Sequence, residues 1–198
     1  MPRLRWAVVS FVAPLLVFTS LRLTTSSHAS VSAGHPLPQT PPRNIPDSCP
    51  VTKPPAHPFV PPAPYSAKLS SRCFWFGTEK LWTVLGIDGT WNGLPHYTAD
   101  DPTFRQKLFF WRKGFDWRSE PQPALTITGK RLDGPAAPLA SDPANAGWQE
   151  RDQAFMVTGI NIPTLGCWEI TAAHYQGQEL TFVVWVTQEP SSPALPAH

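Results

Sequence analysis

Charged side chains are scarce in this sequence, at 15% of 198 residues, and the formal net charge is only +2. The basic residues are scattered and form no run that could neutralise the successive phosphates of a nucleic acid. A nucleic-acid partner is therefore not expected. In place of charge the chain has nine Trp and eleven Phe, which predicts a domain stabilised by large apolar side chains.

Long hydrophobic runs are also missing. The apolar stretch at residues 6–21 is interrupted by Pro14, is followed by Arg22, and is shorter than the roughly 20 residues of a membrane-spanning helix. Arginines precede it and small, polar residues follow it, which is the layout of a secretory signal peptide. We predict a signal peptide at 1–29 and an exported chain, in the periplasm, at the cell surface or in the medium. Only an uncleaved leader would tether it to a membrane.

Proline dominates the next segment, residues 30–65. Proline lacks a backbone donor and biases the residue before it toward extended conformations, so this segment cannot form a helix or a central strand. It is expected to be either a semi-rigid spacer or a strap lying along the domain. We assign the folded domain to residues 66–188 and a disordered tail to 189–198.

Helical periodicity is absent from the folded part. Short β-branched and aromatic runs alternate there with Gly, Pro, Asp and Asn clusters, which predicts an all-β domain. Their number and spacing favour an immunoglobulin-like antiparallel β-sandwich, with a small barrel as the alternative. The predicted strands are 74–76, 81–85, 90–93, 107–111, 124–129, 154–162, 167–174 and 179–187. The stretches 88–101 and 132–151 are predicted to be long loops, where such domains present binding sites.

Cysteine is limited to three residues, which allow one disulfide and one free thiol. Export favours oxidation, and both Cys49–Cys167 and Cys73–Cys167 are compatible with the sequence. The cysteines are too far apart in the sequence for a zinc or iron–sulfur motif. We therefore predict no metal and no cofactor.

Signals of catalysis are equally sparse. The chain has no GxSxG motif, and its serines lie in the leader, the proline-rich segment or isolated turns, so we predict that it is not an enzyme. One alternative is a calcium-binding or hydrolytic site at His96, Asp100 and Asp101, because hard cations bind clustered oxygen ligands. The simpler interpretation is that the aspartates cap a turn.

The aromatic and basic stretch 107–117 (KLFFWRKGFDW) is the most unusual segment. Trp91, Trp111 and Trp117, with Arg112, are candidates for stacking on sugar rings or for anchoring a protein partner. A carbohydrate- or peptidoglycan-binding module is therefore an alternative function. Tryptophans are also common in the core of β-sandwiches, and an arginine can lie over an aromatic ring for structural reasons alone.

Several longer motifs resemble sequences found in a known protein family: CPVT at 49–52, FFWRKG at 109–114, LTITGKRLDGPAAPL at 125–139, IPTLGCWEIT at 162–171 and LTFVVWV at 180–186. The chain resembles a family of uncharacterised exported bacterial proteins that have a leader and a proline-containing segment with CPVT. The resemblance implies that Cys49 and Cys167 form the disulfide, and it implies no activity. The expected function is a non-enzymatic structural or interaction module of the bacterial envelope or secretome, with a protein or glycan partner.

Overall fold

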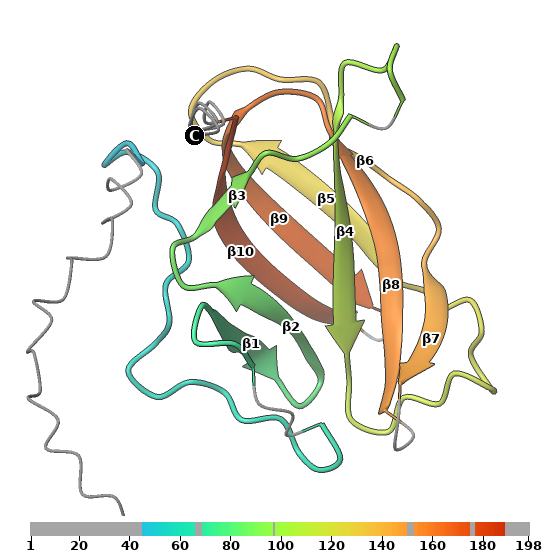
Figure 1. Ribbon diagram of the computed structural model, residues 1–198. Coiled ribbons are helices and arrows are strands. Elements are labelled where there is room, and N and C mark those ends of the chain that lie inside the picture. Colours follow the sequence, from blue (N-terminus) through green and yellow to red (C-terminus); the bar gives the residue numbers. More distant parts are fainter. Residues whose placement is uncertain (1–44, 66–68, 97, 150–152, 175–176, 189–198) are drawn as a thin grey trace, which may run out of the picture. The chain divides into compact units, whose positions relative to one another are not determined.

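A computed structural model of the chain describes residues 45–65, 69–96, 98–149, 153–174 and 177–188 (Figure 1). The predicted signal peptide and C-terminal tail lie outside these residues. Ten strands and no α-helix are found in the described segments. They form two sheets, called sheet A and sheet B below.

Sheet A is antiparallel throughout, in the order β1-β2-β4-β8-β6, and β7 continues the outer edge beside β8. Sheet B has the order β3-β10-β9-β5, in which β3 and β10 are parallel and the other two pairs are antiparallel. The strands are β1 (Cys73–Thr78), β2 (Leu81–Gly86), β3 (Thr90–Asn92), β4 (Phe104–Trp111), β5 (Thr126–Arg131), β6 (Ala140–Ser141), β7 (Asn145–Gln149), β8 (Gln153–Ile162), β9 (Gly166–His174) and β10 (Gln178–Thr187).

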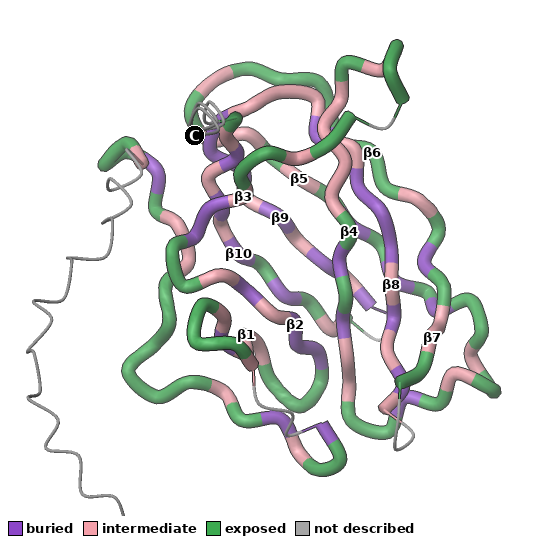
Figure 2. The backbone as a smooth tube through the Cα atoms, in the orientation of Figure 1, coloured by how far each residue is buried: buried purple, intermediate pink, exposed green. Residues whose placement is uncertain are grey.

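The core lies between the two sheets. Buried and more exposed residues alternate along the long strands, as Figure 2 shows, because successive side chains of a strand point to opposite faces. Phe110 and Met156 of sheet A pack in one cluster with Trp168 and Phe182 of sheet B, all of them almost fully buried. The all-β sandwich is thus confirmed, and the immunoglobulin-like assignment within that class stays a prediction.

Eight of the ten strands coincide with the predicted ones to within a few residues, and Gly177 in the last hairpin has the positive φ that such a turn favours. The prediction of a long loop at 132–151 was wrong. Residues 140–149 of this stretch contain β6 and β7, which pair with the outer edge of β8. These strands are short and carry little β-branched or aromatic sequence, so the pairing comes from the exposed edge of β8 rather than from local propensity.

The proline-rich residues 45–65 are a strap along the domain (Figure 1). Cys49 forms a disulfide with Cys167 of β9, the pairing that the family resemblance implied, and Cys73 is free. Beyond the disulfide, the Thr52 amide donates to the Val183 carbonyl at 2.9 Å, and the Val183 amide donates to the Thr52 hydroxyl at 2.8 Å. The strap is therefore fixed to sheet B by one covalent and two hydrogen bonds.

Candidate functional site

The outer face of sheet A carries four aromatic side chains that are not part of the core: Trp75, Phe109, Trp111 and Phe155, here called the aromatic row. They lie on the outer face because their neighbours in the sequence point inward. Trp75 stands between the core residues Phe74 and Phe76, and the same alternation holds on β4 and β8. Each ring is partly exposed, and Phe109 is 37% exposed.

The rings of the aromatic row touch one another. The ring centres of Trp75 and Trp111 are 5.3 Å apart, and those of Phe109 and Phe155 are 5.5 Å apart. Trp111 lies 6.4 Å from Phe109 and 6.5 Å from Phe155, which closes the group. These distances are typical of favourable aromatic pairs, so the row is one contiguous patch, called the platform below, rather than four separate side chains. Within it the rings of Phe109 and Trp111 are nearly parallel, at 27°, and the other pairs are tilted or edge-to-face.

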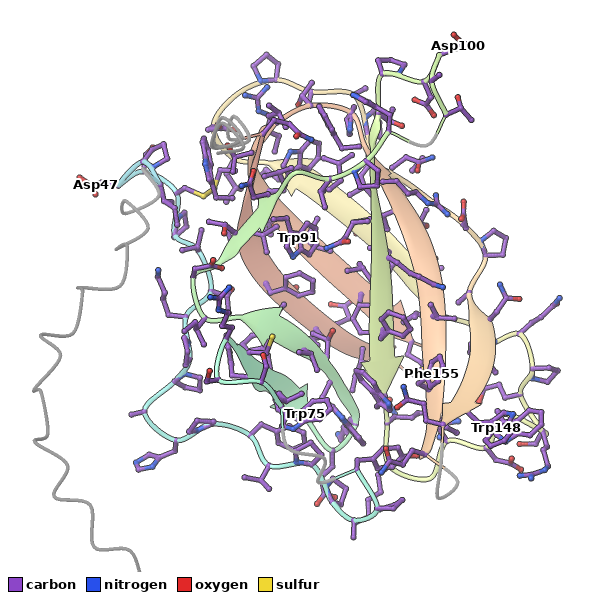
Figure 3. All side chains as sticks on the ribbon, viewed as in Figure 1. Asp47, Trp75, Trp91, Asp100, Trp148 and Phe155 are labelled. Atoms are coloured by element: carbon purple, nitrogen blue, oxygen red, sulfur yellow. A yellow bond between two sulfur atoms is a disulfide. The ribbon has the colours of Figure 1, made fainter. Side chains whose placement is uncertain are left out.

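Gly147 of β7 gives the platform its outer border. A Cβ atom at this position would lie 2.5 Å from Cζ of Phe155, so the absence of a side chain leaves room for the ring to lie over the edge strand. Figure 3 shows Phe155 beside β8 and Trp75 on β1 across the sheet. The glycine is therefore part of what positions the platform.

The strap borders the aromatic row on its other side. Trp82, the cross-strand partner of Trp111, is fully buried because Phe59 and Tyr65 of the strap pack on it, with ring centres 5.6 and 5.4 Å away. Burial raises the pKa of Tyr65, while a hydrogen bond to the Ala154 backbone acts in the opposite direction. The strap thus covers one aromatic side chain of this face and leaves the neighbouring ones open.

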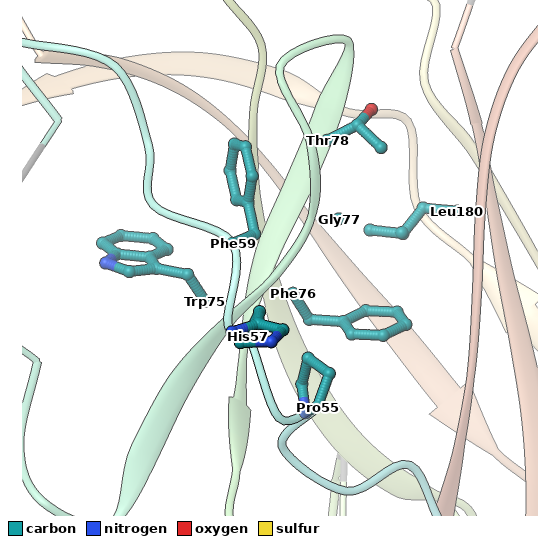
Figure 4. A pocket seen from close by; sticks show the side chains of 8 residues that line it. All are labelled: Pro55, His57, Phe59, Trp75, Phe76, Gly77, Thr78 and Leu180. Carbon is teal, nitrogen blue, oxygen red and sulfur yellow. The ribbon is translucent and has the colours of Figure 1, made fainter.

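An apolar pocket of about 440 Å³ lies where the strap passes β1 (Figure 4). Pro55, His57 and Phe59 of the strap form one wall. In Figure 4 Trp75 and Phe76 project to opposite sides of β1, so the pocket is next to the aromatic row on one side and near Leu180 on the other.

A second hollow, of about 400 Å³, lies at the other end of the outer face. Arg105 and Lys107 of β4 line it together with Asp142, Pro143, Asn145, Val157, Thr158 and Gly159. The outer side of β4 therefore carries two cations, Arg105 and Lys107, followed by two aromatic residues, Phe109 and Trp111.

The candidate tryptophans chosen from the sequence do not form one patch. Trp111 belongs to the aromatic row. Trp91 packs against the core, with its ring centre 6.2 Å from that of Phe182, and Figure 3 shows it pointing between the sheets. Trp117 packs against the core from another side and stacks on Trp148, which is 58% exposed at the edge of β7. All three predicted tryptophans have intermediate burial.

Arg112 lies in a polar network at the end of β4. Its guanidinium donates to Glu120 at 2.6 Å and lies 5.4 Å from the centre of the Phe115 ring. The other carboxylate oxygen of Glu120 is 3.1 Å from Nε2 of His174, whose side chain is fully buried. Burial lowers the pKa of His174 despite the nearby carboxylate of Glu120. Arg112 is therefore placed to hold the 112–123 segment rather than to meet a ligand.

Residues 98–101, which include Asp100 and Asp101, form a turn. Nδ1 of His96 is 3.1 Å from the carbonyl oxygen of Thr103, and the Asp101 carboxylate accepts a hydrogen bond from the Thr103 amide at 2.8 Å. Hydrogen bonds from Thr103 hold the pKa of Asp101 below its usual value. Asp100 lies at the tip of the loop and points outward (Figure 3). Within the described ranges no three His, Cys, Asp or Glu residues come together in a way that could hold a metal ion.

Three residues of the aromatic row, Trp75, Phe109 and Phe155, were not singled out from the sequence. Their signal is visible in retrospect, because Trp75 and Phe155 sit at alternate positions within strands whose other face is apolar. Pairing across β1, β2, β4 and β8 brings them together. No single segment of sequence contains that information.

Comparison with known proteins gave no match among family models, curated proteins or solved structures. The resemblance to a family of exported bacterial proteins therefore stays a prediction. No helix among the described residues is long and apolar enough to cross a membrane.

Proposed function

We propose that this chain is an exported, non-enzymatic interaction module that binds a glycan on the outer face of sheet A. The observation that carries the proposal is the aromatic row, a contiguous set of four partly exposed rings. Flat aromatic faces are suited to the C–H faces of sugar rings, and polar side chains beside them can bond the hydroxyl groups.

The opposite face of the sandwich offers an internal comparison. On sheet B the corresponding outer row across three strands consists of Thr128, Thr171 and Thr181, with Lys130 and Glu169 beside it. A solvated sheet face is normally polar in this way. Among the described strand residues, the outer face of sheet B carries one aromatic side chain, Trp185, whereas that of sheet A carries the contiguous aromatic row, which supports a binding role for sheet A.

Export is supported by the disulfide, since such bonds persist in oxidising compartments. The predicted leader points in the same direction. A bridged strap suits a module that must keep its shape outside the cell, because it fixes Phe59 and Tyr65 over Trp82 at the border of the binding face.

A pull-down with insoluble cellulose, chitin and peptidoglycan tests the proposal. We expect the oxidised protein to bind at least one of them and Trp111→Ala to weaken binding by about 30-fold, the effect of losing a central anchor residue. Thr171→Ala on the outer face of sheet B is the matched control and should bind like the wild type. Failure to bind any glycan, or equal binding by the wild type and Trp111→Ala, would count against the proposal. If Trp111→Ala instead lost affinity for a purified protein partner, the face would be reassigned to protein binding.

A further inference from the structure

The hollow beside the aromatic row has a chemistry of its own. Val157, which lines it, is the cross-strand partner of Phe109. The Lys107 ammonium group, which also lines it, lies 5.7 Å from the centre of the Phe109 ring. Row and hollow are thus parts of one surface, and a ligand lying on the rings can extend into the hollow.

Arg105 packs over Gly159 in the lining of the hollow. Its guanidinium forms an ion pair with Asp142 and donates to the Asn161 side chain at 2.8 Å. It occupies the space above Gly159 that any larger residue would fill, because a Cβ there would collide with the guanidinium carbon and nitrogens. The position of Arg105 therefore depends on a residue without a side chain, and its charge is matched by that of Asp142.

Lys107, unlike Arg105, forms no ion pair among the described residues. It is also exposed. With Arg105 and Asp142 offsetting each other, the side chains lining the hollow retain one positive charge, that of Lys107. A ligand group that complements this hollow carries negative charge and accepts hydrogen bonds from Lys107 and Asn145.

We infer that the hollow at Lys107 receives an anionic substituent, a carboxylate or a phosphate, of a glycan whose sugar ring lies on the aromatic row. This inference rests on the proposed function and narrows its ligand to acidic glycans. The aromatic row supplies affinity for the ring, and Lys107 supplies the preference for the charged form.

The test compares acidic polysaccharides with their neutral counterparts in affinity electrophoresis. Polygalacturonate is matched with its methyl-esterified form, and phosphomannan with dephosphorylated mannan. We expect at least one acidic form to bind about fivefold more tightly than its counterpart, the size of one exposed ion pair, and the preference to shrink with added salt. The acidic form that is preferred identifies the source of the charge.

Variants test the preference for acidic glycans separately from glycan binding itself. Lys107→Gln should abolish the preference while retaining affinity for the neutral forms, Lys107→Arg should keep it, and Lys130→Gln on sheet B is the charge-matched control. Equal binding of acidic and neutral forms by the wild type, or a preference that survives in Lys107→Gln, overturns the inference and leaves the glycan function standing. Absence of binding to every glycan, acidic or neutral, overturns both.

Discussion

Removing the disulfide is the perturbation whose size follows most directly from the structure. Cys49 and Cys167 are both buried and are separated by 118 positions in the sequence. Opening a loop of this length releases chain entropy in the unfolded state worth about 5 kcal/mol in the simple model. Because small domains are stable by only about 5–15 kcal/mol, we expect the double variant Cys49→Ser/Cys167→Ser to lose a third or more of its free energy of unfolding.

Guanidinium unfolding followed by tryptophan fluorescence measures this loss as a lower midpoint. Cys73→Ser is the control, since Cys73 forms no disulfide, and it should shift the midpoint little. Thiol alkylation of the oxidised protein should find two oxidised cysteines and one free thiol. An unchanged midpoint in the double variant, or a loss in Cys73→Ser as large as in the double variant, would refute the assignment of the strap as a covalently fixed element.

Three further predictions concern stability and the shape of the binding face. Because the pKa of His174 is lowered in the folded protein, this histidine is protonated only in the unfolded chain just below pH 6.5. The free energy of unfolding should therefore fall on acidification by up to about 1.4 kcal/mol per pH unit until the folded pKa is reached. Urea titrations should show this slope in the wild type and not in His174→Gln. Trp82→Ala should cost about 3–5 kcal/mol in the same assay, because the indole is fully buried beneath the strap. Gly147→Val should displace the Phe155 ring, lower stability by about 1–3 kcal/mol and weaken glycan binding; an unchanged affinity would show that Phe155 is not part of the platform.

Much of the fold could be predicted because local patterns determine it. The alternation of apolar and polar residues in β9 and β10 identifies two adjacent strands, and Gly177 between them marks the hairpin. The strap was foreseen as one of two alternatives, because proline excludes regular structure at 30–65 but does not decide between a spacer and a packed segment. The packing of Phe59 on Trp82 shows that the segment is packed on the domain, and this contact joins residues that are distant in the sequence.

The candidate site was harder to predict because it depends on strand order. The sequence pointed to tryptophans near the 107–117 segment, yet only Trp111 of that set lies in the aromatic row. Trp75 and Trp111 lie on strands separated by β2, and their rings meet across the outer face of sheet A. Neither β7 nor its Gly147, which leaves room for the Phe155 ring, follows from β propensity. Sites on sheet faces are assembled by register, which a single sequence does not reveal.

Mapping a bound glycan onto individual indole groups tests the central claim most directly. In ¹H–¹⁵N NMR spectra, addition of a soluble oligosaccharide of the preferred glycan should shift the indole N–H resonances of Trp75 and Trp111. Those of Trp91 and Trp168, which pack in or against the core, should stay in place. If the largest shifts fell instead on the threonines of sheet B or on the loop around Asp100, the outer face of sheet A would not be the binding surface.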